Sequence, residues 1–465
     1  MNLSRYIGDK AFYRRALAVS VPIMLQNGIT SFVNMLDNLM VGRMGTAEMT
    51  GVAVANQWFF VFQLCLFGAV SGAGIFGAQF YGKGDDEGLR HAFRFKLLLC
   101  GAITVLAGLV FFFGGEWLAG RFLMGEGSPE EAARSLHFAR DYLHIMLLSL
   151  IPNALIQIYA STLRETGETL LPMKAGFISV MVNLALNTVL IFGVPRLHIP
   201  ALGVYGAAIA TVTARVVEML IVMIWTHRHR ERNTFIVGAW RSMYIPAKLM
   251  WRMFVKGTPL MVNEALWSFG MTMINQGYST CGLDVVAAIN ISSTFWNVFA
   301  VSFQAIGTAI GIIVGQQLGA EKFEEVRSTT RQMIAFSLSV SMVMMVGYML
   351  CSGWIPLMYN TTTVVRHLAT QVILISACRM PFDALAHASY FSLRSGGKVG
   401  ITFVFDCGFV WCLQVPFVFL LTTFAYPAMP FLWLYFCTQA IYAFKSFIGL
   451  YFLKQGKWIQ NVVND

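Results

Sequence analysis

Five acidic residues lie inside long apolar stretches of this chain and are its strongest candidates for chemistry: Asp37, Glu218, Glu264, Asp383 and Asp406. An ionised carboxylate at the depth of a bilayer costs at least about 2.5 kcal/mol. Such a residue is therefore retained mainly where it faces a water-filled cavity, pairs with a basic side chain or stays protonated. A carboxylate in that position is able to hold a monovalent cation, carry a proton or face a cationic ligand.

Asp37 is expected to share its depth with Asn183, Asn187 and Thr211. Helical rise places Asp37 about 8 Å and Asn187 about 9 Å from the outer ends of their helices, and Thr211 about 10 Å into its own. Asn183 lies one turn from Asn187 on the same face. A carboxylate, two amide carbonyls and a hydroxyl suit sodium or a proton. The alternative is a polar cluster that only holds helices together.

Glu264 and Asp383 form a second candidate pair, about 14 Å and about 15 Å from the inner ends of their helices. Two acids at one depth can share a proton, hold sodium or face a cationic substrate. Arg379 is one helical turn from Asp383 and could neutralise it instead. We expect Asp37, Glu264 and Asp383 to be able to contact a cationic ligand as well as a monovalent cation or a proton.

The other two acids carry weaker predictions. Glu218 follows Arg215 by three residues, and this spacing favours a neutralised pair within one helix. Asp406 has no evident partner in the sequence, and both a structural and a functional role stay open for it.

The elements that must position these side chains are membrane helices. The chain is 57% apolar and 12% charged, its mean hydropathy is +0.64, and soluble domains carry roughly 25% charged residues. Stretches long enough to cross about 30 Å of hydrocarbon recur along the chain. We therefore predict an all-α integral membrane protein with twelve transmembrane helices, at 16–42, 52–80, 95–115, 140–163, 173–193, 204–226, 255–281, 289–317, 331–352, 368–393, 399–423 and 429–453.

The sequence also contains an internal repeat. Pro22–Leu25 recurs as Pro259–Val262, and the Leu-Arg-x-x-Gly pattern of Leu163–Gly167 recurs at Leu393–Gly397. Two similar membrane halves are a common plan among secondary transporters, which place substrate at the interface of the repeats.

The repeat predicts two pseudo-symmetric six-helix lobes, residues 1–226 and 255–465. The segment 227–254 between them is expected to be a cytoplasmic linker. Two forms are open for it. Trp240 and Trp251 stand among basic residues, which would suit an amphipathic helix on the membrane surface, and the alternative is a solvated connector.

The basic residues predict the orientation. With a cytoplasmic N-terminus, about 24 Lys and Arg lie on the inner side and about six on the outer side, a strong positive-inside bias. We expect a protein of the inner, cytoplasmic membrane with both termini in the cytoplasm. The net charge of +10 then reflects topology and contact with anionic membrane lipid, not nucleic acid.

Several functional classes lack their signatures. The eight cysteines contain no Cys-x-x-Cys pair, and the close histidines His227 and His229 do not suggest zinc. The sequence has no Walker A motif and no clustered catalytic residues. We expect neither an enzyme nor a resident cofactor, and only sodium or a proton as coupling ion.

Along its whole length the chain resembles the multidrug and toxic compound extrusion (MATE) transporters. The segments that carry the resemblance are Leu36–Gly42, Gly77–Gly82, Leu163–Gly167, Asn183–Asn187, Gly203–Thr211, Asn263–Glu264, Gly307–Ala309 and Gly315–Gly319.

The resemblance implies two six-helix lobes forming a V, and export of drugs in exchange for sodium or protons. Asp37 matches the acid of the family's first helix, and Glu264 and Asp383 match the seventh-helix and tenth-helix acids of the bacterial branch often described as sodium-coupled. Asn183 matches an amide of a cation site. Asn187 departs from the branch that has an aspartate there, which weakens the charge of that site. The departure favours the first branch and leaves the coupling ion open.

We therefore expect small organic cations as substrates, alternating access as the mechanism and a monomeric protein. The rival reading is a flippase for lipid-linked saccharide from the same superfamily. It would need a strongly basic central cavity for pyrophosphate, whereas the charges inside the predicted spans are mostly acidic.

Overall fold

The computed structural model describes residues 6–42, 46–123, 129–193 and 200–464, without the side chains of 33–39, 41–42, 46, 121–123 and 129. The regular elements in this part of the chain are all helical, which confirms the predicted all-α class. A helix bonds its polar backbone groups internally, so long apolar segments can lie in hydrocarbon without unpaired groups.

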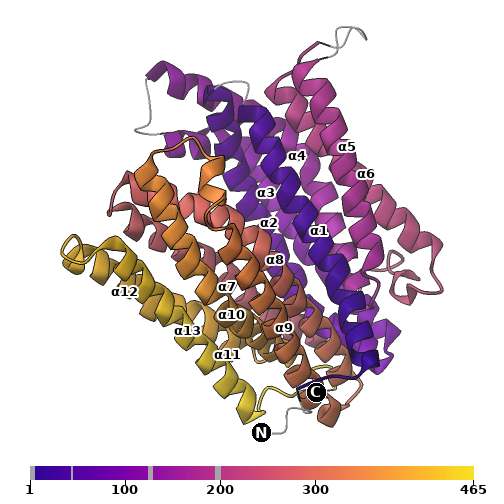
Figure 1. The fold of residues 1–465 in the computed structure, drawn as a ribbon. Helices are drawn as coiled ribbons and strands as arrows, with labels where there is room; N and C mark the ends of the chain where they lie inside the picture. Colours follow the sequence, from indigo (N-terminus) through magenta and orange to yellow (C-terminus); the bar gives the residue numbers. More distant parts are fainter. Residues whose placement is uncertain (1–5, 43–45, 124–128, 194–199, 465) are drawn as a thin grey trace. The chain divides into compact units, whose positions relative to one another are not determined.

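Twelve long helical segments in the described residues correspond to the twelve predicted spans (Figure 1). Ten of them are long and apolar enough to cross a membrane, by length and composition. The other two are α1 and α7, each of 33 residues. The eleventh, Val399–Ala425, combines α-helical and π-helical turns.

The first seven helices are α1 (Lys10–Gly42), α2 (Thr46–Lys83), α3 (Asp86–Leu123), α4 (Pro129–Glu165), α5 (Leu170–Phe192), α6 (Val204–Arg228) and α7 (Ala247–Ser279), with a 3₁₀ turn η3 (Thr234–Ile236) before α7. They are followed by α8 (Leu283–Gly319), α9 (Phe323–Cys351), η4 (Ile355–Met358), α10 (Thr363–Ser395), α11 (Val399–Phe403), α12 (Val415–Leu420) and α13 (Phe431–Gln455), with π-helical turns η5 (Val404–Gly408), η6 (Val410–Gln414) and η7 (Leu421–Ala425).

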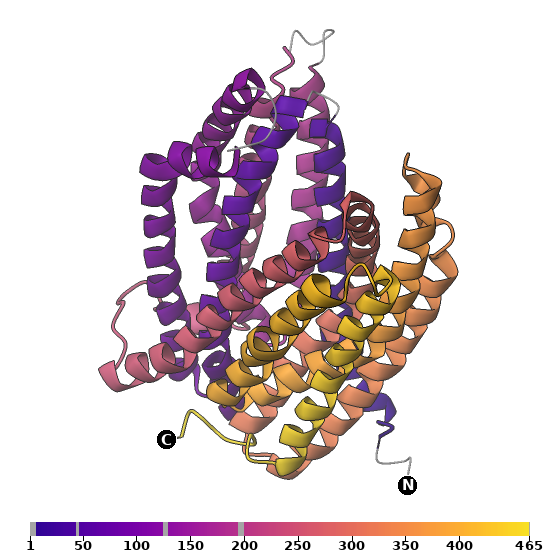
Figure 2. The same ribbon diagram turned by 90° about the vertical axis from the view of Figure 1, so that its left-hand side faces the viewer.

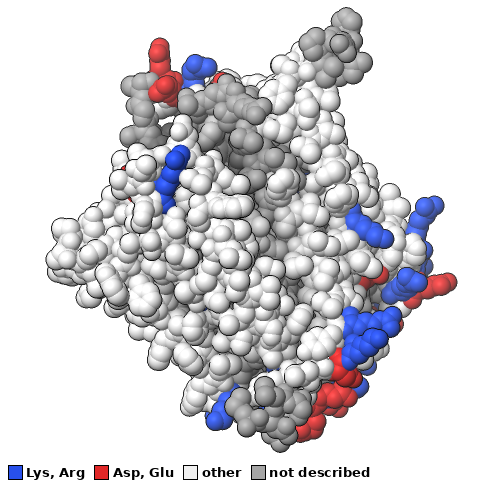
Figure 3. All heavy atoms as spheres, viewed as in Figure 1, with Lys and Arg blue, Asp and Glu red and all other residues white. Residues whose placement is uncertain are grey.

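Large apolar side chains are exposed on many of these helices. Phe113 on α3 is 79% exposed, Leu350 on α9 is 77% exposed and Phe424 in η7 is 81% exposed. Most of the face drawn in Figure 3 is uncharged, and its Lys, Arg, Asp and Glu gather toward the edges. A largely uncharged face together with exposed large apolar side chains suits contact with lipid.

The chain forms two compact units. Unit 1 contains residues 1–24, 78–85 and 262–465, and unit 2 contains 25–77 and 86–261. These units gather separate segments, so they follow a different division from the predicted lobes 1–226 and 255–465, which remain a prediction. Three helices, α1, α2 and α7, contribute residues to both units.

Unit 2 is organised around α4. This helix packs against α3 and α6, and α6 packs against α5. Unit 1 is organised around α10, which packs against α8, α9 and α13 (Figure 2). The first part of α1 joins this unit, where Ala16 and Ile23 are buried in one apolar cluster with Ile306 and Ile310 of α8. Of the polar side chains discussed below, α4 carries that of Glu165, and α10 carries those of Arg379, Asp383, Tyr390 and Arg394.

The segment between α6 and α7 folds onto α3 of unit 2. Arg94 of α3 is buried and donates hydrogen bonds to the backbone carbonyls of Gly238, Ala239 and Tyr244, over 2.9, 3.1 and 3.0 Å. A guanidinium presents several donors in a fixed plane and can bind neighbouring carbonyls together. Arg94 thus fixes the end of this segment to α3.

Aromatic contacts fix the same segment at its start. Phe235 is fully buried, and its ring lies 5.2 Å from that of Phe93. Tyr159 of α4 bonds His227 at 3.1 Å and accepts a hydrogen bond from Trp240 at 3.3 Å.

Within 229–246 the one helical element is η3, so this part of the linker has no amphipathic α-helix. Phe235, Ile236 and Ala239 are buried, whereas Arg230, Arg241 and Tyr244 are exposed, so the segment is partly packed and partly solvated. Its cytoplasmic location stays a prediction.

Candidate functional site

Three of the predicted site residues meet between α5 and α6 of unit 2. Asn183 Nδ2 donates to Thr211 Oγ1 over 3.3 Å, and Asn187 Nδ2 donates to Asn183 Oδ1 over 3.1 Å. Both asparagines are buried, because they occupy the face of α5 that packs on α6. The structure thus brings together the amides and the hydroxyl that helical spacing placed at one depth.

Asp37, the predicted acid of this group, belongs to α1. Its side chain lies outside the described residues. The contact of Asp37 with Asn183, Asn187 or Thr211 therefore stays a prediction.

In unit 1, Glu264 of α7 lies beside two residues of α10. Tyr390 Oη donates to Glu264 Oε1 over 3.1 Å, and the same oxygen lies 3.8 Å from Arg394 Nη1. The glutamate side chain is only 15% exposed. Glu264 therefore combines a direct hydrogen bond from a neutral phenol with a longer approach to a guanidinium.

Asp383 has a different partner. Arg379 Nε donates to Asp383 Oδ2 over 2.8 Å, one turn away on α10, and Arg379 also bonds Gln439 of α13. The guanidinium lies 4.9 Å from the centre of the Tyr442 ring. Asp383 therefore forms the ion pair with Arg379 that its spacing allowed, while Glu264 contacts Tyr390 and Arg394. The contact of Asp383 with a coupling ion or a substrate stays a prediction.

Asp406, for which the sequence shows no evident partner, has two partners in the structure. Its Oδ1 accepts a hydrogen bond from Lys445 Nζ of α13, and its Oδ2 accepts one from Asn263 Nδ2 over 2.9 Å. The predicted pair of Glu218 with Arg215 is confirmed, with Arg215 Nη1 2.9 Å from Glu218 Oε2.

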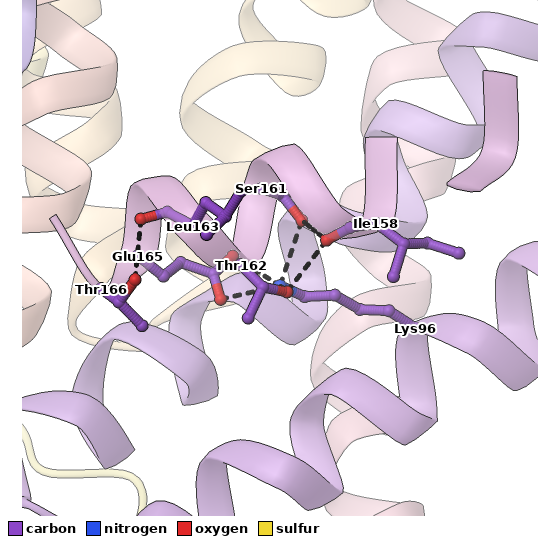
Figure 4. Close-up of polar contacts among 7 residues, drawn as sticks. All are labelled: Lys96, Ile158, Ser161, Thr162, Leu163, Glu165 and Thr166. Atoms are coloured by element: carbon purple, nitrogen blue, oxygen red, sulfur yellow. Dashed lines mark hydrogen bonds and ion pairs between the residues drawn. The ribbon is translucent and has the colours of Figure 1, made fainter. Parts of the chain in front are cut away.

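A further ion pair of unit 2 joins α3 and α4. Lys96 Nζ lies 2.7 Å from both carboxylate oxygens of Glu165, and it also bonds Ser161 Oγ at 3.1 Å and Thr162 Oγ1 at 3.0 Å (Figure 4). The side chain of Lys96 is 0% exposed and that of Glu165 is 8% exposed. A Cβ added to Gly77 of α2 would lie 2.1 Å from Glu165 Oε2. The pair therefore lies where α2, α3 and α4 meet.

Among the described residues, none of the His, Cys, Asp and Glu side chains form a group of three or more that could hold a metal ion. The predicted sodium positions at Asp37 or at Glu264 and Asp383 stay predictions. The oxygen atoms described above belong to hydrogen-bonded networks, and several of them contact basic side chains.

A protein-family model for MatE matches residues 22–189 and 259–420, one segment in each half of the chain. The chain belongs to the MatE family. The match covers more than half of the sequence and contains Asp37, Asn183, Asn187, Glu264 and Asp383.

Two relatives of this MatE protein cover most of its length. The probable multidrug resistance protein YoeA of Bacillus subtilis is 24% identical over 403 residues, which are 86% of this chain and 85% of the relative. The probable multidrug resistance protein NorM of Thermotoga maritima is 24% identical over 469 residues, covering 97% of this chain and 94% of the relative.

Solved structures share the fold. A multidrug resistance MATE family transporter of the MOP superfamily in an outward-facing conformation superposes with a TM-score of 0.85 at 17% identity, over 98% of both chains. A MOP superfamily transporter from Pyrococcus furiosus, described as having a binding pocket of reverse polarity that suggests a different function, gives a TM-score of 0.84 at 17% identity, over 98% of both chains. The MatE chain is thus an integral membrane transporter, not an enzyme.

Several polar residues of this MatE protein were missed as site residues by sequence reasoning. Lys96 and Arg394 were counted among inner-side charges, yet both lie buried inside helices. The expectation that charges inside the spans are mostly acidic is wrong for unit 1. There, each of three acids lies next to a basic residue: Glu264 with Arg394, Asp383 with Arg379, and Asp406 with Lys445. The available signal was Lys445 itself, a lysine within an apolar span.

Proposed function

We propose that this MatE protein exports small organic cations and drugs from the cell in exchange for sodium ions or protons. Relatives named as multidrug resistance proteins support this substrate class. The observation that carries the proposal is Glu264. It is a buried carboxylate of α7 whose short contact is a neutral hydroxyl, that of Tyr390, and whose cation Arg394 is 3.8 Å away.

This arrangement suits exchange of cations. A carboxylate with a close, short ion pair, such as Asp383 with Arg379 at 2.8 Å, has its charge already compensated. Glu264 retains more of its attraction for a cation because its guanidinium is farther away. A proton, a sodium ion or a cationic drug would each compensate the charge, so their binding at Glu264 would be mutually exclusive.

Mutual exclusion supplies the coupling for alternating access. Exchange requires that each ligand bind the inward-open and outward-open states with different affinity. In the proposed cycle the coupling ion enters from outside, lowers the affinity for the organic cation and drives its release outward. The emptied transporter then returns to the inward-open state.

The second proposed coupling position is Asp37 with Asn183, Asn187 and Thr211. The bonded Asn187, Asn183 and Thr211 supply polar oxygen atoms on α5 and α6 of unit 2. Sodium prefers oxygen ligands, and an aspartate would supply the negative charge that this cluster of neutral groups lacks. We also propose that both termini face the cytoplasm, that the protein acts as a monomer and that the coupling ion is its only inorganic requirement.

The test is efflux of a fluorescent organic cation from proteoliposomes, with sodium and proton gradients imposed separately. Efflux driven by either gradient supports antiport and identifies the ion. Absence of efflux under both gradients, from protein shown to be folded, would overturn the proposal. For the variant Glu264→Gln, protein carrying Glu324→Gln serves as the matched control, because this substitution removes an exposed acid at the start of α9.

The rival function, translocation of a lipid-linked saccharide, has one observation in its favour. Arg379, Arg394 and Lys445 place three basic side chains inside unit 1. Each of them lies next to an acid, so the group has no excess positive charge for pyrophosphate. We therefore favour the cation exporter, and a flippase assay with fluorescent lipid-linked saccharide is the next experiment if efflux is absent.

A further inference from the structure

We propose that Lys445 is a built-in cation of unit 1: its ammonium group occupies a position at Asp406 that a sodium ion would otherwise take. This proposal deepens the proposed function, on which its meaning for coupling rests. It implies that sodium coupling, if present, does not act through Asp406.

The first observation is that both carboxylate oxygens of Asp406 already have hydrogen-bond donors. Lys445 is on α13, its side chain is 5% exposed, and its Nζ donates to Asp406 Oδ1. The second carboxylate oxygen accepts from Asn263 Nδ2 over 2.9 Å. Both oxygens of Asp406 are therefore engaged, one of them by a positive charge.

The second observation is the shell around the ammonium. Its nitrogen lies 5.4 Å from the ring centre of Phe405, 5.8 Å from that of Phe409 and 5.2 Å from that of Tyr442. Aromatic faces attract cations, and a carboxylate together with aromatic rings forms a site that selects positive charge. The surroundings of Lys445 are thus those of a cation site whose cation belongs to the protein.

The third observation is an unused oxygen ligand. Asn263 is fully buried, and its Oδ1 has no hydrogen-bond partner among the described residues. Amide and carboxylate oxygens are the ligands that hard cations prefer. Once the ammonium is removed, Asp406 Oδ1 is left without its cation, beside an amide whose own oxygen has no partner among the described residues.

The fourth observation is the balance of charge. Glu264 with Arg394 and Asp383 with Arg379 are ion pairs of the same unit, so Lys445 with Asp406 brings three acids and three bases together. Removing the charge of Lys445 leaves one buried carboxylate uncompensated, which is strongly unfavourable. An external monovalent cation would then be drawn to the vacated position.

The test is thermal unfolding of purified protein in sodium chloride and in choline chloride at equal ionic strength. Any difference between the midpoints of the wild type in the two salts should be unchanged by Asp406→Asn. Lys445→Met should show a saturable, sodium-specific rise of its midpoint by several degrees. The rise should disappear when Asp406→Asn is added. Lys445→Arg, which keeps the charge, is the matched control and should behave like wild type.

Two results would overturn the proposal. One is a sodium-specific stabilisation of the wild type that Asp406→Asn abolishes, since sodium would then bind alongside Lys445. The other concerns Lys445→Met: sodium neither restores its folding nor raises its midpoint, although the double variant with Asp406→Asn folds. These readouts measure binding without drug efflux, so failure of the proposed export would not affect them.

Discussion

Gly82 and Gly319 occupy equivalent positions of the repeat, about 237 residues apart, and each lies against the helix of the other. A Cβ added to Gly82 at the end of α2 would lie 1.9 Å from the carbonyl oxygen of Gln316. A Cβ added to Gly319 at the end of α8 would lie 1.9 Å from that of Gln79. The repeat seen in the sequence is thus also a reciprocal contact within unit 1.

Substitution of either glycine should destabilise the protein. Gly82→Ala and Gly319→Ala would each force two backbones apart, and overpacking of this kind costs about 1–3 kcal/mol. Because the contact is reciprocal, the two losses should be similar when thermal unfolding is measured in detergent. Gly101→Ala on α3 is the control, since nothing lies within 4 Å of its added Cβ and the change should be neutral or stabilising. Unchanged midpoints for both variants would contradict the close contact.

Replacing one partner of the ion pair between Lys96 and Glu165 should lower the free energy of unfolding more than replacing both partners. Lys96→Met or Glu165→Gln leaves one buried partner without its counter-charge, which costs about 3–5 kcal/mol. The double variant should recover part of this loss in a double-mutant cycle of thermal unfolding. The exposed pair Lys322 and Glu325 provides the comparison, because surface pairs contribute about 0–1 kcal/mol. Additive losses from the two single substitutions at Lys96 and Glu165 would argue against a coupled pair.

The proposed coupling acids can be tested in transport. Asp37→Asn and Glu264→Gln keep the approximate shape of each side chain and remove its charge. Each should reduce gradient-driven efflux by about tenfold, corresponding to roughly 1.4 kcal/mol in the coupling step. The rate is measured in proteoliposomes at matched protein content. Normal export by both variants would contradict the assignment of coupling to these acids.

The segment 229–246 should become accessible when its attachment to α3 is removed. Arg94→Gln removes the guanidinium that binds the carbonyls of Gly238, Ala239 and Tyr244. Trypsin should then cut at Arg241 at least several times faster than in the wild type. The cleavage rate is measured by electrophoresis of the fragments. Arg90→Gln, one turn earlier on the same helix, is the control. Equal cleavage rates in both variants would show that Arg94 does not hold the segment.

The sequence by itself determined the class of this protein and the number of its membrane helices. Apolar length decides the class and ten of the twelve helices, because a segment of about 20 apolar residues is stable in hydrocarbon whatever its neighbours are. The other two, α1 and α7, are not among these ten and were predicted from the repeat Pro22–Leu25 and Pro259–Val262 as well. Ion pairs within one helix could also be predicted from the sequence. Arg215 with Glu218 and Arg379 with Asp383 follow from spacings of three and four residues, which place side chains on one face.

Only the tertiary structure decided which helices meet. Lys445 reaches Asp406 from another helix, and Lys96 reaches Glu165 from α3 to α4. Helical periodicity gives the face on which a side chain lies, but it does not say which helix packs against that face. The same reason explains the segment 229–246, whose composition suits several forms and whose form is set by its contacts with Arg94 and Phe93. Partners across helices therefore depend on packing that no local pattern encodes.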